Sequence, residues 1–312
     1  MKKIKWMSVL CALLCVATLA SACGSDKKKN EDGNKDQNNQ QSQGGEDKPG
    51  NNGTDNEDDT GINIEDSLLI QLNDDKTDVG TSGATYADGV LRITKGGVYR
   101  LKGTLTNGQV YITVSKTETV ELILDGCTIT CKNNAAIYCD STDKLYITAN
   151  AGSENTLTDG YNYIYSAVGA DEPNACIFSD DDITLRGSGS LSINGNFKNG
   201  ISSKNDIKIK DLTLLVNAAN TGIRGKESVE INSGKVTVVA GKDGLKASQT
   251  EDAAKGFVEI NGGTVDITAG DDAVQAITQI SINGGKVSAS YEGKALNCDG
   301  EVYTAEGTFT EK

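Results

Sequence analysis

Aspartates in two turns of the C-terminal half are the residues best suited to chemistry in this chain. Asp243 stands in Gly-Lys-Asp-Gly-Leu, and Asp271 and Asp272 stand in Gly-Asp-Asp-Ala-Val. The two turns hold equivalent places in neighbouring sequence repeats, so Asp243 and Asp272 should lie about 4.8 Å apart, one strand spacing. Carboxylates that close repel unless one is protonated or they share a cation, and hard oxygen ligands suit Ca²⁺. The sequence therefore predicts a calcium site at these three residues, with solvated turn aspartates as the alternative.

A second acidic pair precedes two strand-like segments further upstream. Asp182 comes directly before Ile-Thr-Leu, and Asp206 comes before Ile-Lys-Ile in the next repeat. The same reasoning stacks these two carboxylates on neighbouring strands. Both are predicted as metal ligands, and a plain polar corner is the competing interpretation.

Three alternating tyrosines lie in an insertion between repeats. Tyr161, Tyr163 and Tyr165 occur in Gly-Tyr-Asn-Tyr-Ile-Tyr, which places their rings on one side of an extended segment. Such rings present an apolar face that can stack on a sugar and a hydroxyl that can form hydrogen bonds. They are predicted to bind carbohydrate; the alternative is that they pack over the strands they interrupt.

No catalytic constellation is obvious in the sequence. The chain has no His, which removes the commonest general base. Lys246 and Arg224 occupy one repeat position near the late aspartates, and a polysaccharide lyase would need such a base with a cation beside it. Lys246 is predicted to contact carbohydrate, and no residue is assigned a catalytic role.

A recurring phrase reveals the elements that must position these residues. It reads Val-Glu-Ile-Asn-Ser-Gly-Lys-Val, Val-Glu-Ile-Asn-Gly-Gly-Thr-Val and Ile-Ser-Ile-Asn-Gly-Gly-Lys-Val, and a small-then-apolar pair follows each copy. A fixed period of this kind marks stacked repeats, and apolar residues that alternate with polar ones indicate short strands. We therefore expect an all-β parallel β-helix, a solenoid with about 22 residues per rung. Its buried stack should contain Ile201, Ile223, Leu245, Val274 and Leu296.

The N-terminal part is predicted to be a targeting and tethering segment. Residues 1–22 combine three lysines with an apolar stretch, as in a signal peptide. The stretch ends Leu-Ala-Ser-Ala-Cys, which resembles a bacterial lipoprotein box with Cys23 as the lipidated residue. Residues 23–61 are polar and acidic and predict a disordered linker, which leaves 62–312 as the folded domain. These features predict a lipid-anchored protein at the outer face of the cell membrane, in a Gram-positive-type bacterium.

The charge balance limits the partners. The chain carries 44 acidic and 30 basic residues, a formal net charge of −14. Such a charge argues against nucleic acid and against contact with anionic membranes other than through the lipid anchor. It also suggests divalent cations. Outside the signal segment we expect free thiols at Cys127, Cys131, Cys139, Cys176 and Cys298.

Between about residues 65 and 290 the chain resembles clostridial cell-surface carbohydrate-binding β-helix lipoproteins. The matching stretches are residues 97–109, 120–126, 135–138, 155–160 and 174–180, together with the late Ile-Asn-Gly-Gly repeats. The resemblance implies a right-handed parallel β-helix shaped like polysaccharide lyases. It also implies bound Ca²⁺ and plant-cell-wall polysaccharide as the ligand, either polygalacturonate (pectin) or cellulose.

The leading hypothesis is therefore a tethered, non-catalytic polysaccharide-binding protein. One alternative is a calcium-dependent pectate lyase, and another is a structural surface solenoid or adhesin without a sugar ligand.

Overall fold

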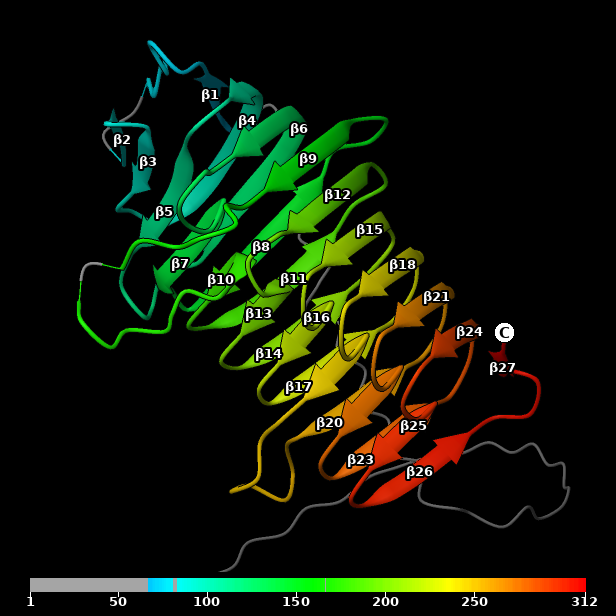
Figure 1. Ribbon diagram of the computed structural model, residues 1–312. Helices are drawn as coiled ribbons and strands as arrows, with labels where there is room; N and C mark the ends of the chain where they lie inside the picture. Colours follow the sequence, from blue (N-terminus) through cyan, green and yellow to red (C-terminus); the bar gives the residue numbers. More distant parts are fainter. Residues whose placement is uncertain (1–66, 81–82, 166) are drawn as a thin grey trace, which may run out of the picture. The chain divides into compact units, whose positions relative to one another are not determined.

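The computed structural model describes residues 67–80, 83–165 and 167–312, all within one compact unit, Thr60–Lys312 (Figure 1). These residues form strands, turns and bends, and no helix occurs among them. The described part accordingly holds no helix that is long and apolar enough to cross a membrane. The predicted signal peptide, Cys23 and the linker lie outside the described residues.

The strands belong to two sheets. The large sheet has 17 strands: β1 (Leu68–Leu72), β4 (Gly97–Leu105), β6 (Val120–Thr130), β8 (Lys144–Ala149), β9 (Glu154–Thr158), β11 (Asp182–Arg186), β12 (Ser190–Gly195), β14 (Asp206–Ile209), β15 (Thr213–Ala218), β17 (Ser228–Ile231), β18 (Lys235–Ala240), β20 (Phe257–Ile260), β21 (Thr264–Ala269), β23 (Gln279–Ile282), β24 (Lys286–Tyr291), β26 (Glu301–Thr304) and β27 (Phe309–Glu311). The small sheet has ten: β2 (Ala84–Ala87), β3 (Val90–Ile93), β5 (Gln109–Thr113), β7 (Ile137–Ser141), β10 (Ala175–Ser179), β13 (Asn199–Ser203), β16 (Ile223–Gly225), β19 (Leu245–Ala247), β22 (Val274–Ala276) and β25 (Leu296–Cys298).

From β7 onward the chain visits the small sheet once and the large sheet twice in each repeat (Figure 1). Each strand pairs in parallel with its equivalent in the next repeat, as β15 does with β18 and β18 with β21. Strand β6 is long enough to pair with both β8 and β9. Two rows of parallel strands in the large sheet therefore begin at β6. Among the described strands, the pair β2–β3 is antiparallel.

Alternating burial explains why the repeated phrase forms strands. In β18 the side chains of Val236 and Val238 point inward and are fully buried, while their neighbours face outward. The turn before β18 contains Gly234 at φ 94°, and Gly263 and Gly285 have φ of 82° and 79° at the equivalent positions. Glycine recurs there because a residue with a Cβ is strained in that left-handed conformation.

The predicted apolar stack is present in the small sheet. Ile201 pairs with Ile223, Ile223 with Leu245, and Leu245 with Val274, and these four side chains are fully buried. Leu296 pairs with Val274 but is only half-buried. It belongs to the last strand of the small sheet, so no further strand of that sheet covers it.

The predicted fold class, a right-handed parallel β-helix with about 22 residues per rung, is wrong. The strands are divided between two sheets of unequal size, with an antiparallel pair at the start of the small one. The repeat length also varies, because 22 residues separate Val229 from its partner Ile207, whereas 29 separate it from Val258. The periodic sequence identifies which positions are equivalent, but it does not say to which sheet each strand belongs.

The five cysteines of the described region are unpaired, and Cys127, Cys131, Cys139 and Cys176 are buried. Burial raises the pKa of the Cys127 and Cys139 thiols to about 12. These residues therefore act as small apolar side chains in the core, as the sequence predicts.

Candidate functional site

The three aspartates predicted to bind metal come together in the structure. Asp243 precedes β19, and Asp271 and Asp272 precede β22, the next strand of the small sheet. Each offers one carboxylate oxygen, and these oxygens lie within 4.8 Å of one another. Asp243 and Asp272 are buried and Asp271 is exposed. The register thus confirms that Asp243 and Asp272 occupy one column.

Neighbouring groups orient these carboxylates without fully neutralising them. Lys246 Nζ lies 2.8 Å from Asp243 Oδ2. The backbone N–H of Lys294 donates to Asp272 Oδ1 at 2.8 Å, and Asn297 Nδ2 donates to Asp272 Oδ2 at 2.6 Å. One lysine therefore faces three acids, and this residual negative charge favours a bound cation.

Gly293 lies directly beside these acids, and its lack of a side chain bears on whether a cation fits there. A Cβ at this position would lie 2.6 Å from Asp272 Oδ1 and 2.7 Å from Asp271 Oδ1. Glycine therefore keeps space open directly beside two of the carboxylates. Carboxylate oxygens around such a space are the ligand set that Ca²⁺ prefers, so the residues fit this ion.

Asp182 and Asp206 also stack, but they form a different arrangement. The Asp206 N–H donates to Asp182 Oδ1 at 3.3 Å, and Ser228 Oγ donates to Asp206 Oδ1 at 2.7 Å. Burial raises the pKa of Asp182, while the hydrogen bond from the Asp206 N–H opposes this rise. No third acidic, His or Cys ligand joins this pair within the described residues. Local hydrogen bonds satisfy the pair, as in a polar corner.

The three tyrosines have different environments. Tyr163 OH donates to Asp159 Oδ2 at 2.7 Å and its ring stacks on Phe197 at 4.4 Å, while Tyr165 OH donates to the carbonyl of Pro173 at 3.0 Å. These two rings hold the insertion against the strands. Tyr161 is 74% exposed, so only this ring offers an open face.

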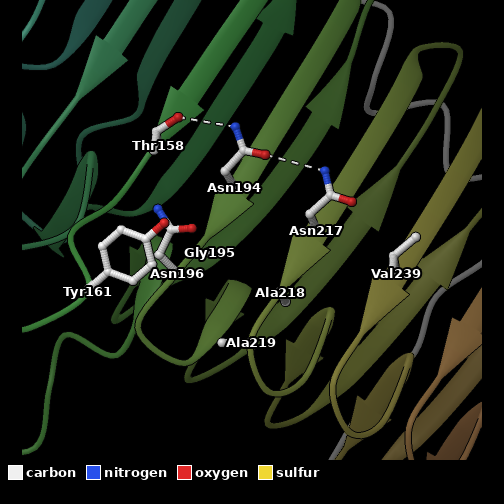
Figure 2. A pocket seen from close by; sticks show the side chains of 9 residues that line it. All are labelled: Thr158, Tyr161, Asn194, Gly195, Asn196, Asn217, Ala218, Ala219 and Val239. Carbon is white, nitrogen blue, oxygen red and sulfur yellow. Dashed lines mark hydrogen bonds between the residues drawn. The ribbon is translucent and has the colours of Figure 1, made fainter.

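Tyr161 borders a groove that sequence reasoning missed. Figure 2 shows its ring beside a row of side chains on successive strands of the large sheet. The groove has a volume of about 490 Å³, and its lining includes three small residues, Gly195, Ala218 and Ala219. We call it the asparagine groove, and its side chains come from Thr158, Tyr161, Asn194, Asn196, Asn217 and Val239.

A ladder of hydrogen bonds runs along the asparagine groove. Asn194 Nδ2 donates to Thr158 Oγ1 at 3.1 Å, and Asn217 Nδ2 donates to Asn194 Oδ1 at 3.3 Å (Figure 2). Val239 continues the same register on β18. Each of these residues directly follows a buried apolar residue in its strand, for example Ile193 before Asn194. That period-2 signal could have identified the row from sequence.

Comparisons with known proteins agree with one another. A family model described as carbohydrate-binding domain-containing protein matches residues 87–311. A carbohydrate-binding domain-containing protein of Acetivibrio thermocellus is 38% identical over 239 residues, which cover 76% of this chain and 84% of the relative. A solved structure of the polysaccharide lyase-like protein from C. thermocellum, a gadolinium derivative, superposes with a TM-score of 0.76 at 38% identity. That match covers 79% of this chain and 99% of the other.

Proposed function

Because the chain belongs to the family of carbohydrate-binding domain-containing proteins, we propose that its asparagine groove binds an extended polysaccharide. The observation that carries this assignment is the exposed ring of Tyr161 beside the Thr158–Asn194–Asn217 ladder (Figure 2). An aromatic ring offers a flat apolar face to the C–H face of a sugar. Side-chain amides both donate and accept hydrogen bonds, as sugar hydroxyls require.

The groove suits a chain better than a single sugar. Four neighbouring strands, β9, β12, β15 and β18, carry its row of Thr158, Asn194, Asn217 and Val239, and neighbouring strands are about 4.8 Å apart. A polysaccharide that lies across the strands would therefore meet one outward side chain per strand. We infer that affinity is distributed over several repeats rather than concentrated in one deep pocket.

We further propose a plant-cell-wall polysaccharide as the ligand, either polygalacturonate or cellulose, and Ca²⁺ at Asp243, Asp271 and Asp272. Clustered carboxylate oxygens and the space beside Gly293 support the ion. When bound, Ca²⁺ would bridge two neighbouring repeats, because its ligands come from the turns before β19 and β22. The protein would act at the outer face of the cell membrane, held there by a lipid on Cys23.

Binding without cleavage is the function we favour. The asparagine groove is lined by Thr, Tyr, Asn, Gly, Ala and Val side chains, and none of these is a base near neutral pH. A polysaccharide lyase is the second candidate, because the related solved structure is named polysaccharide lyase-like. Absorbance at 235 nm distinguishes the two, since a lyase acting on polygalacturonate generates an unsaturated product that absorbs there.

Substitution of Tyr161 tests the groove. We expect Tyr161→Ala to weaken polysaccharide binding by up to about tenfold, on the scale of about 0.5–1.5 kcal/mol that an aromatic pair contributes. Isothermal titration with soluble cello- and galacturono-oligosaccharides measures the change. Tyr303→Ala is the matched control, because Tyr303 is 55% exposed on β26, far along the sheet from the groove. Equal affinities for the two variants would move the binding site elsewhere.

A further inference from the structure

A cationic pocket lies on the small sheet of this acidic protein. It has a volume of about 340 Å³, and its lining includes Lys198, Arg224 and Lys246 together with Asn174, Asn199 and Asn220. Arg224 and Lys246 stand directly opposite each other on the paired strands β16 and β19. Three cations therefore converge in a chain whose net charge is −14.

Two of these cations have no acidic partner. Within the described residues, no carboxylate lies at ion-pair distance from Arg224 or Lys198, while Lys246 pairs with Asp243. The side-chain hydrogen bond of Arg224 goes to Ser248 Oγ at 3.2 Å, which uses one of the five N–H donors of a guanidinium. Arg224 is half-buried, and its remaining donors are available to a ligand in the pocket.

Two residues next to these cations on the small sheet also lack hydrogen-bond partners for a buried polar atom. Ser202 on β13 pairs with Arg224, and Gln275 on β22 pairs with Lys246. Ser202 Oγ and Gln275 Oε1 are both buried without a hydrogen-bond partner in the described structure. Buried polar atoms are normally paired. A polar atom without a partner therefore lies on each side of the Arg224–Lys246 pair.

The pocket adjoins the asparagine groove around one row of turns. Asn196 lines the groove and Lys198 lines the pocket, while Ala219 lines the groove and Asn220 lines the pocket. Residues one or two positions apart lie within about 7 Å. The two surfaces therefore adjoin at these turns.

We propose that this pocket binds the carboxylate of a uronate residue in the polysaccharide, with Arg224 as its main ligand. The inference rests on the proposed function and deepens it. A planar guanidinium binds a carboxylate through two parallel hydrogen bonds. Lys198 adds a second charge without an acidic partner. Lys246, which pairs with Asp243, stands one strand spacing from Arg224 and adds a third positive side chain to the pocket. The groove then recognises hydroxyl groups, and the pocket selects acidic sugars.

The test compares three oligosaccharides of equal length by isothermal titration: hexagalacturonate, its methyl ester and cellohexaose. We expect Arg224→Gln to weaken hexagalacturonate binding at least about tenfold, as for a lost charge-assisted hydrogen bond. Affinity for cellohexaose and for the methyl ester should not change. Arg224→Lys keeps the charge without the fork and should give an intermediate loss. Lys235→Gln removes an exposed cation at the start of β18 and should leave all affinities as they are.

The outcomes separate the two proposals. If the parent protein binds hexagalacturonate and Arg224→Gln binds it equally well, the pocket assignment is wrong and the proposed function stands. The same conclusion follows if the parent protein binds cellohexaose but not hexagalacturonate. If it binds none of the three, both proposals fail. Equal losses in Arg224→Gln and Lys235→Gln would show a general charge effect, which also overturns the assignment. Melting curves of every variant verify that each is folded.

Discussion

At the scale of single residues, Asp159 links the tyrosine insertion to the groove. It accepts hydrogen bonds from the Tyr163 hydroxyl and from the backbone N–H of Asn196, which itself lines the groove. Burial raises the pKa of Asp159 to about 6 from an ordinary value of 3.8. A single buried carboxyl group thus connects the insertion to the groove.

The raised pKa of Asp159 gives stability a predictable pH dependence. The folded state binds this proton more tightly than the unfolded state, so the contribution to stability is lost as pH rises from about 3.8 to 6. We expect Asp159→Asn to be more stable than the parent at pH 7, by about 2 kcal/mol, with the difference vanishing near pH 4. Urea unfolding at both pH values measures this. A difference that does not change with pH would contradict the assigned cause.

The aspartate cluster makes a second prediction at this scale. We expect chelation of Ca²⁺ to lower the melting temperature, because an ion bound at one hundred times its Kd stabilises the native state by about 2.7 kcal/mol. Asp272→Asn should remove most of this response. Asp299→Asn, at an exposed position, serves as the control and should retain it. Identical melting curves with and without chelator would leave these residues as ordinary turn aspartates.

At the scale of elements, the small sheet depends on its apolar column. Leu245 is fully buried on β19 between Ile223 and Val274. Each strand of this sheet contributes few inward side chains, because several are only three residues long. Loss of one inward side chain therefore removes contacts with both neighbouring repeats.

We expect Leu245→Ala to lower the free energy of unfolding by about 2–5 kcal/mol, as for other buried leucines. Leu245→Asp should cost more, because an unpaired charge would enter the core. Leu215→Ala makes the same chemical change at an outward position of β15 that is 36% exposed, and its effect should be below about 1 kcal/mol. If the two alanine variants unfold at the same denaturant concentration, the assigned burial of Leu245 is wrong.

At the scale of the whole molecule, stacked repeats provide a surface longer than any one repeat. Because each repeat contacts its neighbours, outward residues at equivalent positions form rows across the sheets (Figure 1). The asparagine groove and the cationic pocket are both rows of this kind. Such rows suit an extended polymer as the ligand. The lipoprotein box predicts that the protein itself is tethered to the cell.

The anchor is testable independently of the fold. We expect the mature protein to fractionate with membranes, since two acyl chains on one cysteine anchor a protein stably. Cys23→Ala should release the protein into the medium or leave an uncleaved precursor. Immunoblots of membrane and culture fractions measure this, with Cys15→Ala as the control inside the same segment. Unchanged fractionation of Cys23→Ala would discard the anchor.

The sequence by itself determined the equivalent positions, because strands that pair in parallel place residues of successive repeats side by side. This is why the column from Ile201 to Val274, the pairing of Asp243 with Asp272 and the neighbourhood of Arg224 and Lys246 could all be predicted.

Only the tertiary structure decided how the strands divide between two sheets and which outward residues remain uncovered. Period 2 separates inward from outward, but it does not show that Tyr163 packs on Phe197 while Tyr161 borders a groove. That groove joins a loop to strands of four repeats. Contacts between such distant segments depend on how loops fold over the sheets, and the local sequence pattern does not predict those contacts.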